Sequence, residues 1–490
     1  MASPAEAREP AVPAAPQGPA GVFEIAPEEE LLYSLTADGK RKFIRPTLSR
    51  GRYWRIRRRF ACSLILLYFA LPLLRVGGQP AFRIDLTGSR VHLFGATLHP
   101  GDNLLLVALG LGLVITIFFV GSTFGRMWCG YTCPQTVYLE FVFRPIEVLL
   151  EGPPPRQRRL NAAPWSAGKL AIKSAKWALW ILVALLMAGT FVAYFTGWQP
   201  LLAGLATEPG AWRGALFAIA IVTTLILFDF GWFRDQMCTI ACPYGRLQNV
   251  IADRDTILVA YDTDRGEPKM RMRDRGPGIV AGDCIDCRSC VATCPTGTDI
   301  RRGLQVECIG SAQCIDACDA VMVGIGKPPG LIRYSSLRQQ SGGERRILRP
   351  RTLVYLALLT IAWGSFAGML LSRGVARAEI GRGGREPYRL LPGGEVASEQ
   401  RVRITNQLTE PQRFTLTLVS PEAARLTTGG APVEVPPDGH VAIRAVTNAP
   451  ADLFVDGQLD VRYRLTSDRG FDEEIAFVLL GPYTAAGGKR

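Results

Sequence analysis

The most specific chemical signal in the sequence is the run Cys284-x2-Cys287-x2-Cys290-x3-Cys294, which is followed by Pro295. Three thiolates at this spacing can surround one iron–sulfur cubane while the fourth cysteine turns away, which predicts a [4Fe–4S] site. The alternative is a zinc site, but zinc ligands usually come as two cysteine pairs that are separated by a long gap. The spacing therefore favours an iron–sulfur cluster over zinc.

A second run, Cys308-x5-Cys314-x3-Cys318, has Ser311 where a ferredoxin pattern would place a cysteine. Together the two runs resemble a two-cluster bacterial ferredoxin, in which the fourth cysteine of each run binds the other cluster. That resemblance implies a first cluster held by Cys284, Cys287, Cys290 and Cys318, and a second held by Cys308, Cys314 and Cys294 with Ser311 in place of a thiolate. Serine alkoxide or water can complete the second cluster, or it can lose iron and become [3Fe–4S]. We expect it to be labile or of altered potential, because ligand identity sets the potential of a cluster.

Two further cysteine pairs repeat the pattern Cys-x3-Cys-Pro, at residues 129–134 and 238–243, each directly after an apolar stretch. Residues four apart share a helix face and can present both sulfurs to one ion. Proline is favoured at the first helical position, so we expect interfacial helices to begin at Pro134 and Pro243. The cysteine before each proline then lies at a helix N-terminus, where the helix dipole lowers the pKa of a thiol.

These pairs are the candidate catalytic and metal-binding residues. Soft sulfur ligands select Cu(I), and the adjacent Met127 and Met237 can add thioether sulfur. Buried structural cysteines are the alternative, but a pattern that recurs at one membrane face favours a metal or redox site. The candidate copper ligands are Cys129, Cys133, Cys238 and Cys242, with Met127 and Met237 as further ligands. Cys62 stands alone in an apolar run and is expected in the core.

The elements that must position these residues are membrane helices. Hydrophobic residues make up 48% of the 490 residues and charged ones 20%, which favours a membrane protein and excludes disorder over the whole chain. None of the three histidines lies in a long apolar run, so a membrane haem held by helix histidines is excluded. Stretches near the ~20 residues of a bilayer span predict five spans, at about 60–77, 103–121, 177–198, 215–233 and 353–371. The first is the weakest of the five because it contains Pro72.

The net charge of +13 is best explained by arginines that flank apolar segments, which indicates anchoring at a membrane and no nucleic-acid partner. Lys and Arg crowd residues 126–176 and 234–351 but are sparse in 78–102 and 199–213. The amino terminus and the cysteine-rich insert are therefore expected in the cytoplasm, and the chain after about residue 373 in the periplasm. All twelve cysteines then fall on the reducing side or in the first span.

The predicted fold is a multi-domain membrane protein with an α-helical core of five spans, an inserted two-cluster ferredoxin-like α+β domain and a C-terminal Ig-like β-sandwich. The last of these follows from alternating apolar and polar runs between Gly, Pro and Asn turns. In it, His440 stands alone and is expected to be an ordinary surface or core residue. Asp229 is expected as an interfacial residue at the end of the fourth span. The predicted domains are a flexible cytoplasmic tail (1–50), a four-span core (51–252), the ferredoxin-like domain (253–350), a fifth transmembrane helix (351–374) and a periplasmic β-sandwich (375–490).

The motifs Cys-Gly-Tyr-Thr-Cys-Pro, Cys-Thr-Ile-Ala-Cys-Pro, Cys-Ile-Asp-Cys-Arg-Ser-Cys-Val-Ala-Thr-Cys-Pro-Thr-Gly and Cys-Ile-Asp-Ala-Cys-Asp, together with the β-rich tail, resemble the family of the cytochrome c oxidase accessory protein CcoG, also called FixG or RdxA. NapH-like quinol dehydrogenase subunits share the membrane and ferredoxin motifs, but a fifth span and an exported sandwich favour CcoG. The resemblance implies a membrane-bound iron–sulfur cupric reductase that supplies Cu(I) for assembly of cbb3-type cytochrome c oxidase. Its copper-binding motifs fall on Cys129, Cys133, Cys238 and Cys242.

Two other functions stay open: a quinol-oxidising electron-transfer subunit, and a non-enzymatic copper-binding assembly scaffold. The expected cofactors are two iron–sulfur clusters and copper. The expected partners are membrane lipid, the copper ion, a cytoplasmic electron donor, a periplasmic copper chaperone or oxidase subunit, and a second copy of the chain. The expected location is the bacterial inner membrane, which the chain crosses several times.

Overall fold

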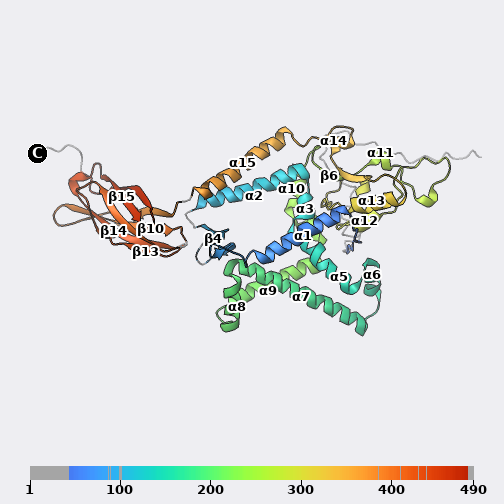
Figure 1. Ribbon diagram of the computed structural model, residues 1–490, viewed down its shortest axis with the longest axis horizontal. Helices are drawn as coiled ribbons and strands as arrows, with labels where there is room; N and C mark the ends of the chain where they lie inside the picture. Colours follow the sequence, from blue (N-terminus) through green and yellow to red (C-terminus); the bar gives the residue numbers. More distant parts are fainter. Residues whose placement is uncertain are drawn as a thin grey trace, which may run out of the picture. The chain divides into compact units, whose positions relative to one another are not determined.

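The computed structural model describes residues 43–86, 88, 90–98, 102–372, 374–384, 386–408, 410–428, 430–437 and 439–483 (Figure 1). Most of the tail that was predicted to be flexible, residues 1–42, lies outside the described residues. Residues 43–50 are held against the cysteine-rich insert: the Thr47 amide donates to the Ala292 carbonyl at 2.8 Å, and the Thr293 hydroxyl donates to the Thr47 carbonyl at 2.8 Å. For these eight residues the prediction of flexibility is wrong. The chain forms two compact units. It passes from one unit to the other between residues 72 and 73, between 107 and 108, and between 363 and 364.

Four helices in the described part of the chain are long and apolar enough to cross a membrane. They match the second to fifth predicted stretches: α2 (Asn103–Phe124), α7 (Ala167–Thr196), α9 (Arg213–Phe228) continued by the π-helical turn η3 (Asp229–Phe233), and α15 (Pro350–Leu371). Helix α1 (Arg52–Ala70) covers much of the first predicted stretch but is not among the four. Its first two turns are rich in arginine, which lowers its mean hydropathy.

Helix α1 packs against the membrane helices with one face only. Arg57 and Ala61 on that face are buried, and the Tyr68 hydroxyl donates to the Met187 carbonyl of α7 at 2.8 Å. Cys62 is exposed, so the prediction that it lies in the core is wrong. The reason is its place on the helix: it follows Ala61 and is therefore turned about 100° away from the packed face.

The two Cys-x3-Cys-Pro motifs, residues 129–134 and 238–243, follow α2 and α9 and are built from short helices. We call them the first and the second hairpin. Pro134 and Pro243 are the first residues of α4 and α10, with Cys133 and Cys242 as N-caps, which confirms the predicted helix starts. The elements of this region are α3 (Met127–Tyr131), α4 (Pro134–Tyr138), η2 (Leu139–Phe143), α5 (Arg144–Glu151), α6 (Pro154–Ala162), α8 (Trp198–Thr207), η4 (Met237–Ala241) and α10 (Pro243–Ile251).

The cysteine-rich insert is built on an antiparallel pair of strands, β6 (Leu258–Tyr261) and β7 (Ile332–Ser335), with short helices over a small apolar core. Its two ends are joined by Asp253 and Arg349, which form an ion pair, and Arg349 also donates to the Ser122 carbonyl of α2 at 2.6 Å. The two ends of the insert thus meet at the C-terminal end of α2. Its helices are α11 (Thr263–Gly266), η5 (Met272–Asp274), α12 (Ser289–Thr293), η6 (Ile300–Arg302), α13 (Gln313–Gly324) and α14 (Leu337–Gln340).

The second unit contains the C-terminal β-sandwich, which confirms the predicted fold of this region. One sheet has the strand order β12-β14-β10-β8, with β9 also pairing with β10, and the other has the order β13-β11-β15-β16. Residues on β10 alternate between buried and less buried positions, as a strand with one face on a core requires. His440 is exposed at the start of β14. The strands are β8 (Ala376–Arg382), β9 (Arg389–Leu390), β10 (Glu395–Asn406), β11 (Gln412–Ser420), β12 (Arg425–Thr428), β13 (Val433–Val435), β14 (His440–Pro450), β15 (Gln458–Ser467) and β16 (Asp472–Leu480), with the turn η7 (Ala451–Leu453).

The same unit includes small strands between α1 and α2. They form a two-stranded ribbon and a three-stranded sheet in the order β3-β4-β5. The strands are β1 (Arg75–Val76), β2 (Gln79–Pro80), β3 (Phe82–Asp85), β4 (Arg90–Leu93) and β5 (Ala96–Leu98).

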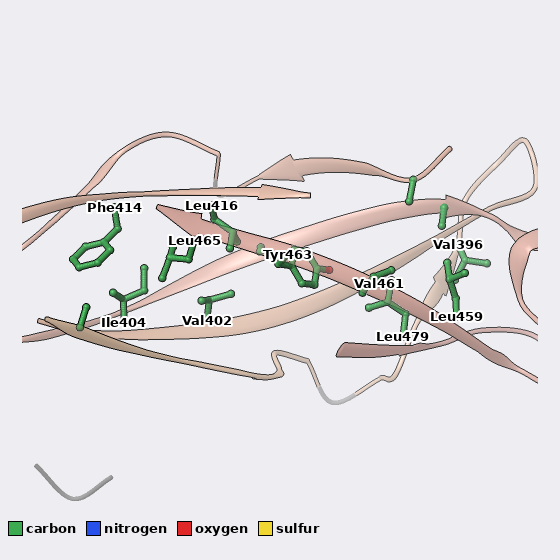
Figure 2. Close-up of a cluster of buried hydrophobic side chains, with 14 of the residues drawn as sticks. Val396, Val402, Ile404, Phe414, Leu416, Leu459, Val461, Tyr463, Leu465 and Leu479 are labelled. Carbon is green, nitrogen blue, oxygen red and sulfur yellow. The ribbon is translucent and has the colours of Figure 1, made fainter. Parts of the chain in front are cut away.

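The sandwich core consists of buried hydrophobic side chains, with Tyr463 among them (Figure 2). Tyr463 belongs to a buried group of hydrogen-bonded side chains. The Thr447 hydroxyl donates to Gln400 Oε1 at 3.1 Å and lies 2.6 Å from the Tyr463 hydroxyl. A threonine has one hydroxyl proton, so Tyr463 is the donor to Thr447. Tyr463 is fully buried.

We predict that Tyr463→Phe destabilises the sandwich by about 1–3 kcal/mol, because the buried Thr447 oxygen loses its donor. Hydrogen exchange of the full-length protein in detergent measures this as faster exchange of the β14 and β15 amides. Tyr483→Phe is the matched control, since Tyr483 is exposed. Equal protection in both variants would show that the hydroxyl contributes nothing.

Candidate redox and metal site

The four cysteines assigned to the first cluster line one pocket. Cys290 lies on α12 and Cys318 on α13, while Cys284 and Cys287 come from the preceding loop. That loop can wrap around the cavity because Asp286 adopts a left-handed conformation with φ of 49°. Four sulfur donors around one cavity fit a [4Fe–4S] cluster.

Burial controls the ionisation of these thiols. It raises the pKa of Cys290 and of Cys318 to about 12, so at neutral pH they ionise only beside a strongly cationic partner. Cys287 is exposed, whereas Cys284 and Cys290 are buried. The first site therefore reaches the surface of the insert at Cys287.

Cys294, Cys308 and Cys314 also come together, at the end of α12 and the start of α13. Burial raises the pKa of Cys308 to about 11, and the nearby Cys294 adds to the increase. Burial likewise raises the pKa of Cys314 well above its ordinary value, with Cys308 and Cys294 as the next contributors. Ser311 is buried in the same loop. Three thiols and a hydroxyl fit a second cluster with one position that is not held by sulfur.

The two membrane cysteine pairs converge on one another. Burial raises the pKa of Cys129, Arg126 lowers it, and the thiols of Cys133 and Cys242 raise it further. Burial raises the pKa of Cys238 to about 12, with contributions from the other three cysteines. Such interactions act over short distances, so the four sulfurs occupy one region. Within the described residues, however, no three His, Cys, Asp or Glu side chains stand in the geometry of a metal site.

The local structure of each pair differs from the predicted single helix face. Cys129 lies on α3, which ends at Tyr131, and Cys133 is the N-cap of α4. Cys238 lies on the π-helical turn η4, and Cys242 is the N-cap of α10. The chain bends between the two cysteines of each pair because proline cannot continue a preceding helix without losing a hydrogen bond.

The predicted lowering of the thiol pKa is wrong at Cys133. The amides of Gln135 and Thr136 do lower the pKa of Cys133, as a helix N-terminus should, but burial is the larger effect and the net shift is upward. Burial also dominates at Cys129 and Cys238. Desolvation of the thiolate outweighs the helix dipole here.

Hydrogen bonds join the two hairpins. Gln135 Nε2 donates to Asp229 Oδ1 and to the Arg234 carbonyl, both at 3.0 Å. Arg126 Nη2 donates to the Cys238 carbonyl at 3.3 Å, and Arg234 makes a bidentate pair with Glu147 at 3.0 and 2.8 Å. Asp229, at the end of the fourth span as predicted, therefore connects the first hairpin to the second.

The two methionines lie differently. Met127 lines a cavity of about 340 Å³ that also contains Cys308, Gly310 and Tyr334. Met237 is 37% exposed at the start of η4. Neither position tests whether these methionines bind metal, so Met127 and Met237 stay predicted ligands.

The first hairpin touches the loop of the second cluster site through backbone atoms. A Cβ added to Gly130 would lie 2.9 Å from the Ile309 carbonyl oxygen, and one added to Gly310 would lie 3.2 Å from the Arg126 carbonyl carbon. Only glycine permits so close an approach on both sides. Tyr334 reinforces it: its hydroxyl donates to the Gly310 carbonyl at 3.1 Å and lies 3.1 Å from the Tyr131 hydroxyl.

Several residues that the sequence prediction did not single out complete this junction. The Asp316 carboxylate accepts from the amides of Tyr53 and Trp54 at 3.0 and 2.8 Å and so caps α1. Its place between Cys314 and Cys318 was a signal for a role beside the clusters. The other contacts are Gln313 Nε2 to Glu140 Oε2 at 3.2 Å, Arg144 Nη2 to the Pro295 carbonyl at 3.1 Å, and Arg57 Nε to the Gly130 carbonyl at 2.7 Å.

Comparison with protein families agrees with this arrangement. Residues 233–337 match a 4Fe-4S dicluster domain, and residues 366–482 match the Ig-like fold at the C-terminus of FixG. Residues 106–157, which include the first hairpin, match a 4Fe-4S binding domain. The iron–sulfur and sandwich domains of the predicted fold are thereby confirmed.

Relatives match over most of the chain. Protein RdxA of Cereibacter sphaeroides is 34% identical over 430 residues, which cover 82% of this chain and 89% of RdxA. The nitrogen fixation protein FixG of Rhizobium meliloti is 31% identical over 471 residues, or 86% and 88% of the two chains. A crystal structure of a FixG-related protein from Vibrio parahaemolyticus covers 22% of this chain and 98% of its own at 16% identity, with a TM-score of 0.20 that supports no structural conclusion.

The apolar helices, the cysteine clusters, the sandwich and these relatives agree on one identity. The chain is a membrane iron–sulfur protein with an electron-transfer role, and it belongs to the FixG/RdxA family.

Proposed function

We propose that the protein is a cupric reductase that converts Cu(II) to Cu(I) at the hairpin cysteines and supplies Cu(I) for assembly of cbb3-type cytochrome c oxidase. One observation carries the proposal. The hairpin that bears Cys129 lies in backbone contact with the loop that bears Cys308, through Gly130 and Ile309. A site built from soft sulfur ligands is thus adjacent to an iron–sulfur domain.

The reaction is the addition of one electron to Cu(II). The iron–sulfur clusters, when bound, supply one-electron transfer. The four buried or partly buried hairpin cysteines bind the copper substrate and stabilise Cu(I), because soft thiolate prefers the reduced ion. Arg126 donates to the Val306 carbonyl of the insert and to the Cys238 carbonyl of the second hairpin. Its positive charge therefore lies beside the cysteines, which copper binding leaves deprotonated.

We infer five spans in the bacterial inner membrane, with α1 as the first. Its N-terminus is capped by Asp316 of the insert, and Tyr68 near its C-terminus bonds to Met187 and Tyr194 in the second half of α7. Helix α1 therefore extends from the insert along most of a spanning helix. The proposed orientation has the insert in the cytoplasm and the sandwich in the periplasm, and it is supported by the Lys- and Arg-rich loops on the side of the insert.

The proposed partners follow from this topology. A cytoplasmic electron donor would meet the insert near Cys287, where the first cluster site reaches the surface. A periplasmic copper chaperone or oxidase subunit would bind the sandwich, and a second copy of the chain is a further proposed partner.

A second candidate function is a quinol-oxidising conduit, in which the four hairpin cysteines hold a cluster instead of copper. Two observations favour it. Residues 106–157, with Cys129 and Cys133, match a 4Fe-4S binding domain. The cavity beside Cys308 lies next to the end of α2 and is lined by apolar side chains such as Phe124 and Ile257, which suits a quinone ring.

Replacing hairpin cysteines separates these functions. Cluster-replete protein is reduced anaerobically, freed of reductant and given Cu(II), and Cu(I) is followed by a colorimetric chelator. We expect Cys129→Ala and Cys238→Ala to lower Cu(I) formation at least roughly tenfold with unchanged iron content, because the substrate loses soft ligands.

Cys62→Ala, on the exposed face of α1, is the control and should behave as wild type. Loss of about four irons per chain in the hairpin variants, with quinone reduction in wild type, would instead support the conduit. Copper binding without any reduction would leave only a scaffold.

The backbone contact makes its own prediction. In Gly130→Ala the new methyl group must displace the Ile309–Gly310 backbone. We expect copper reduction to slow by roughly 10- to 100-fold while copper binding and iron content persist, because geometry at a reacting junction is displaced. Gly168→Ala is the matched control, since nothing lies within 4 Å of that position. A Gly130→Ala protein with the wild-type rate would remove the main support for the proposal.

The five-span topology is tested by reporters at both ends of the chain. Green fluorescent protein fused before residue 1 should fluoresce, and alkaline phosphatase fused after Tyr483 should be active, because an odd number of spans puts the ends on opposite sides. Both reporters behaving as cytoplasmic, or both as periplasmic, would show an even number of spans.

A further inference from the structure

Arg57 is the most unusual buried charge at the junction between the hairpins and the insert. Its side chain is 0% exposed. Nε donates to the Gly130 carbonyl at 2.7 Å, and the guanidinium lies 5.6 Å from the centre of the Phe141 ring. Among the described residues, neither terminal nitrogen has a hydrogen-bond partner. A fully buried cation with two free donors is strongly unfavourable unless an anion meets it.

Among the described residues, Asp316 is a carboxylate near Arg57, and its charge raises the pKa of Arg57. Its oxygens accept from the amides of Tyr53 and Trp54, and the terminal nitrogens of Arg57 make no hydrogen bond to it. Tyr131 and Tyr334 bond to each other through their hydroxyls, and both are neutral at physiological pH.

Two neighbouring buried arginines, Arg126 and Arg144, use terminal nitrogens in hydrogen bonds, whereas Arg57 does not. The terminal nitrogens of Arg126 donate to the Val306 and Cys238 carbonyls, and Arg144 pairs with Glu140. Among the described residues of this junction, Arg57 is therefore the buried arginine that has no hydrogen bond at either terminal nitrogen.

Its position shows which ligand that is. The Gly130 carbonyl that holds Arg57 belongs to the residue in contact with Ile309, next to Cys308. Burial lowers the pKa of Arg57 to about 10, and Tyr131, Tyr334 and then Cys294 oppose this. The guanidinium thus stays charged at neutral pH, and Cys294, a predicted ligand of the second cluster, is the cysteine within its electrostatic reach.

We propose that Arg57 is the charge partner of the second iron–sulfur cluster: its guanidinium, held at the Gly130 carbonyl beside the loop of Ile309, acts through its charge on the site of Cys294, Cys308 and Cys314 and raises the reduction potential of the cluster bound there. A positive charge and N–H donors beside a cluster favour the state with the extra electron. This offsets the effect of Ser311, because a hard oxygen ligand in place of a thiolate disfavours the reduced cluster. The inference rests on the iron–sulfur part of the proposed function and is independent of copper.

The same guanidinium also binds the hairpin. A change at the second cluster site is thereby communicated to the Gly130 carbonyl, one residue from Cys129. Arg57 is a positioning residue in this sense: it touches the hairpin directly and acts on the cluster through charge.

The test is a redox titration of the full-length, anaerobically reconstituted protein, followed by electron paramagnetic resonance. We expect Arg57→Gln to lower the reduced-to-oxidised ratio of the second cluster roughly tenfold at a fixed potential, which corresponds to a midpoint shift of about 59 mV for one electron. The first cluster serves as the internal reference and should not shift. Arg57→Lys keeps the charge and should recover most of the potential. Arg59→Gln makes the same charge change at an exposed position of α1 and should leave both clusters at their wild-type potentials.

The outcomes are distinguishable. Full iron content in Arg57→Gln with an unshifted second midpoint, or an equal shift of both clusters, overturns the inference. If Arg57→Gln does not retain the cluster, wild-type protein with ¹⁵N-labelled arginine decides: a nitrogen coupling at the reduced second cluster supports the inference, and its absence overturns it. Wild-type protein without a second cluster would refute the iron–sulfur part of the proposed function itself.

Discussion

The junction between the membrane core and the iron–sulfur insert depends on a steric constraint, the close approach of two backbones at Gly130 and Gly310. Any side chain at either position would separate the hairpin from the loop of the second cluster site. The hydrogen bonds of Tyr334, Arg57 and Arg126 are arranged around this contact and hold it in place. A contact made by backbone atoms is also rigid, because no rotamer change can relax it.

Buried charges hold the helices around the cysteine pairs together. Glu147 pairs with Arg234, and Glu151 pairs with Lys173 and Lys176 at 2.7 and 2.8 Å. Desolvation makes such pairs poor sources of net stability, but removing one partner leaves a buried charge uncompensated. These pairs therefore fix one arrangement of the hairpins. Arg234, Lys173 and Lys176 thus bind carboxylates of the protein itself.

Two opposing effects meet at the hairpin cysteines. A helix start lowers the pKa of a thiol, and the amides of Gln135 and Thr136 act on Cys133 in this direction. Burial acts in the opposite direction and is larger at Cys129, Cys133 and Cys238. Thiols in this environment become thiolates when a cation displaces the proton, which couples ligand binding to deprotonation.

The sequence by itself determined the elements that depend on local pattern. Cysteine spacing predicted the iron–sulfur domain, apolar length predicted four helices long enough to span a membrane, alternation predicted the sandwich, and Pro134 and Pro243 marked two helix starts. Each of these signals is carried by residues close together in the chain. The convergence of the four sulfurs was predicted as well, from the duplication of one motif.

Only the tertiary structure decided which residues meet across long separations. Arg57 is one of several arginines in a row, and nothing in its local pattern distinguishes it from Arg58 and Arg59 until the helix turns it inward toward Gly130. Local pattern likewise does not show that Cys62 is exposed, because its position around the axis of α1 decides which side it faces. The direction of the thiol pKa shifts could also be determined only from the tertiary structure. Desolvation depends on every chain segment that covers a group and not on the residues beside it in sequence.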